Sequence, residues 1–210
     1  MALINPQEDF WKSKINLSYA QDNSTFDMDL GISAWKRILH RVNTLEINSY
    51  LDCGANIGRN IGFLKETLPL ASSSIIEIAL EPFEECKRRY KIDNSFLGSI
   101  KNAKFGENFD LVFTSGVLIH INPDDLIETM ANMFRLSSRY ILICEYFNRT
   151  PITINYKGEN DRLFKRDFGK LFMENFDCKI IDYGFLWGQE FDDAGFDDIT
   201  YWLFEKSNKI

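Results

Sequence analysis

The stretch that most constrains the fold is "SYLDCGANIGRN", residues 49–60, in which an apolar run ends in an acid and a glycine-containing turn. This pattern is typical of a parallel strand that feeds a tight turn and the N-terminus of a helix. Asn56 stands where a dinucleotide-binding motif would have its middle glycine, between Gly54 and Gly58. Asp52 opens the turn, where a pyrophosphate site would avoid negative charge. The stretch predicts either a site for a cationic or hydrogen-bond-donating ligand or a structural strand-to-helix connection.

Strand and helix patterns alternate along the rest of the chain. We expect strands at 48–53, 74–82, 95–100, 109–119 and 139–147, with helices at 30–42, 58–68, 83–91, 123–136 and 166–176. Two last strands, 178–187 and 198–206, flank an acidic segment and read as a hairpin. The alternation predicts an α/β fold: a Rossmann-like three-layer sandwich around a mostly parallel seven-stranded sheet, with an antiparallel C-terminal hairpin at its edge.

We expect a single domain, because 210 residues suffice for one well-buried core. Residues 1–45 are predicted to form an N-terminal helical cap segment, and residues 46–210 the core. The polar, turn-rich segment 148–165 follows the fifth predicted strand. Functional loops concentrate beyond the carboxyl ends of parallel strands, so we predict a substrate-loop insertion there.

Composition excludes several classes of function. A formal net charge of −7 disfavours nucleic-acid binding, which needs a cationic face. The four cysteines form no C-x-x-C pair and there are only two histidines, so we expect no metal site. No stretch is apolar for long enough to span a membrane, and we expect a cytoplasmic protein with a small-molecule substrate. The sequence leaves the oligomeric state open.

Glu81 narrows the choice of ligand. It closes the second predicted strand, 29 positions after Asp52, where an acid accepts hydrogen bonds from the hydroxyls of a ribose. The alternative is an acid at the N-terminus of a helix, just before Pro82. A ribose without a pyrophosphate, next to an acid for the amino-acid part, predicts S-adenosylmethionine rather than NAD.

Several motifs carry a resemblance to known proteins. "LDCGANIGRN", Glu81 and "FDLVFTSGVLIHI" resemble the cofactor motifs of class I S-adenosylmethionine-dependent methyltransferases. "GVLIHINPDDL", "RYILICEYFNRTPITINYKGENDRLFKRDF" and "DYGF…DDITYWLFEK" are similar to the pseudaminic acid biosynthesis-associated methylases, over almost the whole chain. The cofactor residues that the resemblance implies are Asp52, Gly54, Asn56 and Gly58 at the methionine part, Glu81 at the ribose, Gly98, Ser99 and Ile100 at the adenine, Ser115 and Gly116 beneath the sulfonium, and Tyr19 and Asn23 closing over the cofactor.

The candidates for catalysis follow the fourth and fifth predicted strands. His120 is the candidate general base, and the alternative is a histidine that caps a helix or packs beneath the sheet. Glu145 and Tyr146 are candidates for orienting an acceptor, with a structural role as the alternative.

Cations near the end of the 148–165 segment favour an anionic acceptor, unless they pair with neighbouring acids. The candidate substrate-binding residues are Tyr156, Arg162, Lys165 and Arg166.

The predicted function is methyl transfer from S-adenosylmethionine to a small, anionic acceptor, such as a sugar or nucleotide sugar in surface-glycan biosynthesis. Two alternatives stay open. One is a non-catalytic protein that binds S-adenosylmethionine as a regulator or partner, and the other is an NAD-dependent oxidoreductase.

Overall fold

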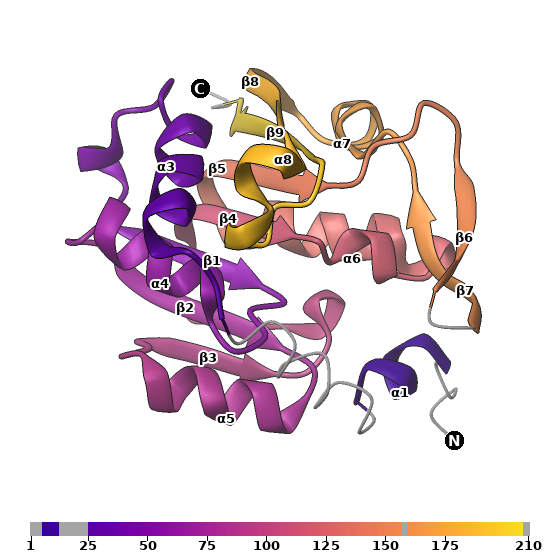
Figure 1. The fold of residues 1–210 in the computed structure, drawn as a ribbon, viewed down its shortest axis with the longest axis horizontal. Coiled ribbons are helices and arrows are strands. Elements are labelled where there is room, and N and C mark those ends of the chain that lie inside the picture. Colours follow the sequence, from indigo (N-terminus) through magenta and orange to yellow (C-terminus); the bar gives the residue numbers. More distant parts are fainter. Residues whose placement is uncertain (1–5, 13–24, 157–158, 208–210) are drawn as a thin grey trace.

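The computed structural model describes residues 6–12, 25–156 and 159–207, with the side chains of 6, 156 and 159–162 excepted. A twisted seven-stranded sheet forms the middle of the molecule (Figure 1). In spatial order its strands are β3 (Asn94–Leu97), β2 (Ser72–Glu77), β1 (Ser49–Cys53), β4 (Phe109–Ser115), β5 (Ser137–Glu145), β9 (Ile199–Lys206) and β8 (Cys178–Leu186). The first five are parallel, and β9 runs antiparallel to both of its neighbours. The predicted fold class is confirmed.

Helices cover both faces of the sheet. One face packs against α3 (Met28–Ile38), α4 (Arg59–Thr67), α5 (Leu80–Arg89) and the short α8 (Gly188–Phe191). The other face packs against α6 (Pro123–Leu136) and α7 (Phe168–Asn175). Each face has its own hydrophobic cluster, which gives the three-layer arrangement. Short 3₁₀ turns complete the fold: η1 (Thr44–Glu46), η2 (Ile100–Asn102), η3 (Leu118–His120) and η4 (Asp192–Ala194).

The second strand is shorter than its sequence predicts. β2 ends at Glu77 because its carboxylate accepts hydrogen bonds from the backbone N–H groups of Ile78 and Ala79, which turns the chain out of the sheet. Helix α5 then begins at Leu80, and Pro82 fits its first turn because proline needs no N–H there. Glu81 therefore lies in the first turn of a helix, which was the alternative to its predicted place at the end of a strand.

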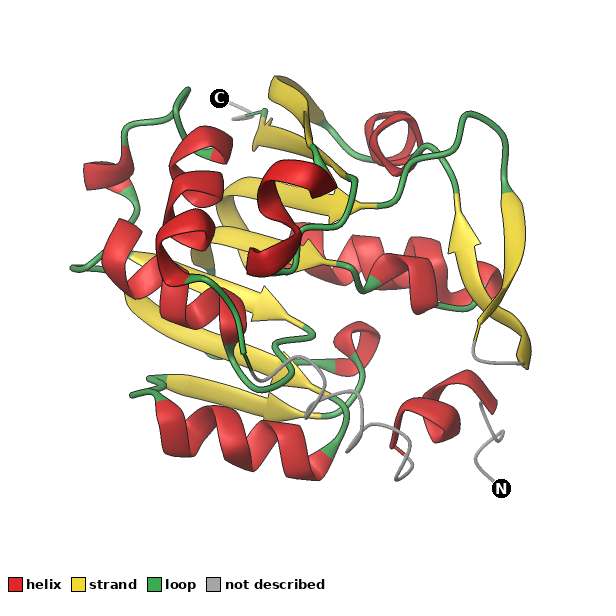
Figure 2. Cartoon of the chain, viewed as in Figure 1, coloured by secondary structure: helices red, strands yellow, loops and turns green. Residues whose placement is uncertain are grey.

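The segment predicted as a polar loop forms an antiparallel hairpin of β6 (Ile152–Tyr156) and β7 (Glu159–Lys165), apart from the main sheet (Figure 2). Leu163 and Phe164 on β7 are buried, and β7 lies against η3. These two consecutive apolar side chains point to opposite faces of the hairpin, and both are covered where it docks beside the end of β4.

The N-terminal segment contributes in two different ways. α3 is part of the core, because Ala34, Trp35 and Ile38 are fully buried and Gly31 lets the ring of Phe63 approach its backbone. α1 (Pro6–Lys12) instead lies at the other end of the molecule, near the hairpin (Figure 1). Within the described residues, no helix combines the length and apolarity required to cross a membrane.

Candidate functional site

The turn after β1 has an unusual backbone. Gly54, Asn56 and Gly58 all have positive φ angles, of 93°, 50° and 87°. A side chain at Gly54 would meet Val117 at 2.6 Å, so this glycine allows the turns after β1 and β4 to touch. A side chain at Gly58 would meet Cys86 Sγ at 2.7 Å. Gly58 thus permits α4 to pack on α5, and it does not line the cavity described next.

A cavity of about 1200 Å³, open solvent at its mouth included, lies at the carboxyl ends of β1, β2, β3 and β4. Its walls come from the turns after these four strands, from α1 and from the start of α6. The structure thus gathers most of the predicted cofactor residues and the candidate base in one place. The predicted residues that line the cavity are Gly54, Asn56, Gly98, Ser99, Ile100, Ser115, Gly116 and His120.

Glu77 is the acid at the end of the second strand. It lines the cavity and accepts hydrogen bonds from the backbone N–H groups of Asn56 at 2.8 Å, Ile78 at 2.8 Å and Ala79 at 2.9 Å. Burial raises the pKa of Glu77, and these three bonds oppose the rise. Glu81, the predicted ribose ligand, is exposed on α5 and does not line the cavity. Glu77 takes the position that the prediction gave to Glu81.

Asp52 lies beneath the cavity rather than in its wall. The side chain is fully buried, and neither carboxylate oxygen has a hydrogen-bond partner among the described residues. Burial raises the pKa of Asp52 to about 8; the negative charge of Glu77 adds to the rise and the guanidinium of Arg59 opposes it. Asp52 therefore keeps its proton at neutral pH.

Two buried polar atoms of the cavity wall fit a polar ligand. Asn56 Oδ1 and Ser115 Oγ have no hydrogen-bond partner within the part of the chain that the structure describes. Gly116, which also lines the cavity, has a φ of 67°, and a Cβ placed on it would meet nothing within 4 Å. Buried polar atoms are usually paired, so these two favour a bound molecule that supplies the partners.

His120 is the one candidate catalytic residue that the structure places in the cavity wall. It ends η3 and is only 9% exposed. Its ring packs on the indole of Trp11 with centroids 4.3 Å apart, and its carbonyl accepts a hydrogen bond from Gln7 at 2.7 Å. Residues from α1, far away in the sequence, thus fix its position.

Glu145 supports this turn from below and does not line the cavity. Its fully buried carboxylate accepts hydrogen bonds from the N–H groups of Val117 at 3.0 Å, Leu118 at 2.9 Å and Ile119 at 3.3 Å. Burial raises the pKa of Glu145 to about 7, and these bonds oppose the rise. In this structure Glu145 holds the turn that carries His120.

The other predicted residues lie outside the cavity wall or outside the described residues. Tyr146 donates a hydrogen bond to Asp197 at 3.5 Å, and the ammonium of Lys165 lies 4.6 Å from the centre of the tyrosine ring. Burial lowers the pKa of Arg166, whose Nε has no partner among the described residues. None of these three lines the cavity. The predicted residues that lie outside the described part are Tyr19 and Asn23, and the side chains of Tyr156 and Arg162.

Sequence reasoning missed a part of the wall that comes from α1, η2 and α6. Gln7, Glu8 and Trp11 belong to α1, and Lys101 of η2 forms an ion pair of 2.8 Å with Asp125 of α6. Only the amphipathic spacing in "PQEDFWK" could have pointed to α1, and it does not say what the helix covers. Among the described residues, no group of three or more histidine, cysteine or acidic side chains could hold a metal ion.

Comparison with models of protein families and with curated proteins finds no match. Solved structures do match the fold. One is 1,6-didemethyltoxoflavin-N1-methyltransferase from Burkholderia thailandensis, with bound 1,6-didemethyltoxoflavin and S-adenosylhomocysteine. Its TM-score is 0.68 at 12% identity, over 99% of this chain and 93% of that one. The chain has the fold of S-adenosylmethionine-dependent methyltransferases.

Two further structures agree with this assignment of the fold. Magnesium protoporphyrin IX methyltransferase from Synechocystis PCC 6803, with bound S-adenosylmethionine, has a TM-score of 0.64 at 12% identity, over 99% of this chain and all of that one. An S-adenosylmethionine-dependent methyltransferase from Leishmania major has a TM-score of 0.67 at 17% identity, over 85% and 72% of the two chains. The narrower resemblance to pseudaminic acid biosynthesis-associated methylases is not confirmed and stays a prediction.

Proposed function

We propose that the protein is an S-adenosylmethionine-dependent methyltransferase that acts on a small molecule. The observation that carries the proposal is the position of Glu77. It places an acid at the end of β2 in the same cavity as the glycine turn after β1 and the turns after β3 and β4. The structural neighbours from Burkholderia and Synechocystis, crystallised with S-adenosylhomocysteine and S-adenosylmethionine, support this choice of cofactor.

The residues of the cavity fit the parts of this cofactor. Glu77 Oε2 accepts one backbone hydrogen bond and keeps a lone pair for a ribose hydroxyl. Gly98, Ser99 and Ile100 form a wall suited to the adenine. Asn56 Oδ1 and Ser115 Oγ can pair with the polar groups of the amino-acid part. The cavity therefore offers polar partners for the ribose and for the amino-acid part of the molecule.

When bound, this cofactor supplies a methyl group that its sulfonium has already activated. The chain must then orient an acceptor and keep water away. His120, buried under Trp11 in the cavity wall, is placed to take a proton from an acceptor hydroxyl or amine. Glu145 contributes indirectly, because it fixes the backbone of the turn before His120.

We propose an anionic acceptor, such as a sugar or a nucleotide sugar in surface-glycan biosynthesis, and a cytoplasmic location. Support for the anionic acceptor comes from the sequence resemblance and from Lys165 and Arg166, two cations that lie outside the cavity wall but beside the chain that leaves β5, in a protein of net charge −7. Tyr156 and Arg162 belong to the same hairpin and stay candidates. A small-molecule acceptor also agrees with the names of the neighbours, which include methyltransferases for a porphyrin and a toxoflavin precursor.

Isothermal titration with S-adenosylmethionine, S-adenosylhomocysteine and NAD tests the cofactor. We expect the first two to bind and NAD not to bind. Glu77→Gln should weaken binding roughly tenfold or more, because a hydrogen bond to a charged group is worth about 1.5–3 kcal/mol. Glu81→Gln is the matched control, because Glu81 is exposed outside the cavity, and it should bind like the wild type.

Tight NAD binding, or equal affinities of the two variants, would contradict the proposal. A second assay separates an enzyme from a non-catalytic binder. Transfer of a tritiated methyl group to a panel of anionic sugars and nucleotide sugars is the expected result. Tight cofactor binding without transfer to any acceptor in the panel would favour the non-catalytic alternative.

A further inference from the structure

Helix α1 spans the cavity from the turn after β3 to the turn after β4. Gln7 donates a hydrogen bond to the carbonyl of His120 at 2.7 Å, and the ring of Trp11 packs on the ring of the same histidine. Glu8 Oε1 lies 3.6 Å from the ammonium of Lys101. Residues 7, 8 and 11 share one side of the helix, and all three line the cavity. The helix thus forms a wall that joins η2 to η3.

The attachment of α1 is mostly polar. Within the described residues, the two hydrophobic clusters draw none of their members from α1. α3 differs, because its Ala34, Trp35 and Ile38 are fully buried in the core. Separating α1 from the cavity would break contacts that include the Gln7 hydrogen bond, the Glu8–Lys101 ion pair and the Trp11 ring contact, whereas separating α3 would open the core.

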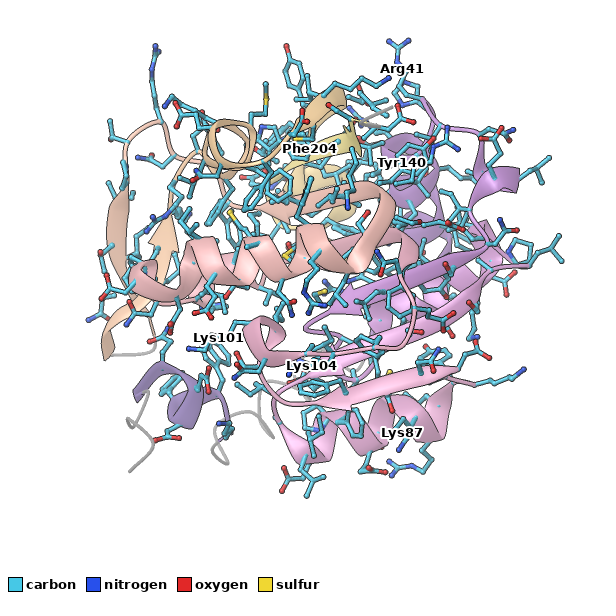
Figure 3. The ribbon with its side chains drawn as sticks, turned by 180° about the vertical axis from the view of Figure 1, so that it is seen from behind. Arg41, Lys87, Lys101, Lys104, Tyr140 and Phe204 are labelled. Atoms are coloured by element: carbon cyan, nitrogen blue, oxygen red, sulfur yellow. The ribbon has the colours of Figure 1, made fainter. Side chains whose placement is uncertain are left out.

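Lys101 is the centre of the ionic part of this attachment. Its ammonium pairs with Asp125 Oδ1 at 2.8 Å on one side and with Glu8 on the other. The three side chains are only 19–25% exposed. Burial lowers the pKa of Lys101, but the hydrogen bond and the charge of Asp125 outweigh it, so the pKa is raised and the ammonium stays charged. Figure 3 shows Lys101 between α1 and the turn that contains η2.

We propose that Lys101 is a positioning residue that fastens α1 over the cavity, and that α1 must separate from Lys101 before the ligand enters or leaves. The inference rests on the proposed function in one respect, because it takes the ligand to be S-adenosylmethionine or S-adenosylhomocysteine. Asp125 lies on α6 and not on α1, so its pair with Lys101 does not depend on α1, and the Glu8–Lys101 pair is the ionic contact that must open together with the contacts of Gln7 and Trp11 to His120.

The direct test measures ligand release. Protein loaded with tritiated S-adenosylmethionine is chased with excess unlabelled S-adenosylhomocysteine, and the retained label is followed on filters. Lys101→Met and Glu8→Gln should each release the label roughly two- to fivefold faster, which corresponds to the strength of a partly exposed ion pair. Lys104→Met is the matched control, because Lys104 is an exposed lysine of the same turn that does not line the cavity, and it should release at the wild-type rate.

The dependence of the release rate on salt is a second measurement, and a purely structural role of Lys101 would not change it. Raising the ionic strength should speed release from the wild type, because it weakens the ion pair, and should change release from Lys101→Met much less. Trypsin provides a readout that needs no ligand. Cleavage after Lys12, followed by mass spectrometry, should be faster in Lys101→Met than in Lys104→Met. Glu8→Gln is not used in this assay, because Glu8 also pairs with Lys12 itself.

The outcomes separate the two proposals. If the wild type does not bind S-adenosylmethionine, the proposed function fails, and the trypsin assay still reports on the attachment of α1. If the wild type binds but Glu8→Gln and Lys101→Met release label at the wild-type rate, the inference is overturned. Equal acceleration by Lys104→Met would overturn it as well. If Lys101→Met does not fold, the release assay can still be done with Glu8→Gln, because Glu8 lies on α1 and outside the hydrophobic core.

Discussion

Asp52 is a buried carboxyl at the end of β1, and its titration should be visible in the stability of the whole protein. Its pKa is about 8 in the folded chain, against an ordinary value of 3.8. Between these values the folded protein binds more protons than the unfolded chain, so its free energy of unfolding falls as the pH rises. The loss is about 1.4 kcal/mol per pH unit, which gives about 2.7 kcal/mol between pH 5 and pH 7.

Asp52→Asn removes this titration and keeps the shape of the side chain. Urea unfolding of both proteins, followed by circular dichroism at pH 5, 6 and 7, measures the effect. We expect the free energy of unfolding of the variant to improve, relative to the wild type, by about 2.7 kcal/mol across this range. A buried amide without partners adds a cost that does not depend on pH, so it shifts the variant's curve without changing its slope.

Parallel curves for the two proteins would refute the reasoning, because they would show that Asp52 titrates alike in the folded and unfolded chains. A relative loss of stability in the variant as the pH rises would refute it more strongly. It would mean that Asp52 is ionised in the fold and stabilised by Arg59, the cation that opposes the rise in its pKa.

Three further substitutions probe the core and the site. Gly31→Ala should cost about 1–3 kcal/mol in urea unfolding, because its Cβ would overlap the ring of Phe63, whereas Gly106→Ala, which meets nothing within 4 Å, should not. Glu145→Gln should cost about 1–3 kcal/mol in thermal unfolding, since its NH₂ group cannot accept a backbone N–H; an unchanged melting temperature would contradict that role. His120→Ala should lower kcat roughly 10²–10⁴-fold with little change in cofactor affinity, and full turnover would exclude it as the base.

The sequence predicts the sheet and its helices well because their patterns are local. The helix at 123–136 has the predicted bounds, since Pro123 and two acids mark its start and Asn122 caps it. The end of β2 is harder, because the apolar run continues past Glu77 and the turn there depends on hydrogen bonds that the carboxylate makes. The sequence pattern therefore indicates Glu81 as the acid that ends the strand, whereas the structure has Glu77 there.

In the candidate site, too, local features can be predicted from the sequence and contacts between distant residues cannot. The turns that follow the strands are predictable, because the carboxyl ends of parallel strands meet at one edge of a sheet. The contribution of α1 is not, since Gln7 meets His120 across 113 positions of the chain. The sequence also does not show whether a carboxylate at the end of a strand faces the cavity. Glu145 instead faces backbone N–H groups beneath the cavity.

The position of β9 has a consequence for how the chain is made. β9 comes last among the described strands, yet it lies inside the sheet, between β5 and β8. A ribosome releases the first five strands well before β9, so during synthesis the full edge of β5 waits unpaired. Until residue 206 has left the ribosome, that edge can pair with another chain instead. We therefore expect a chain truncated before β9 to aggregate during expression. It should not behave like a stable protein that merely lacks one edge strand.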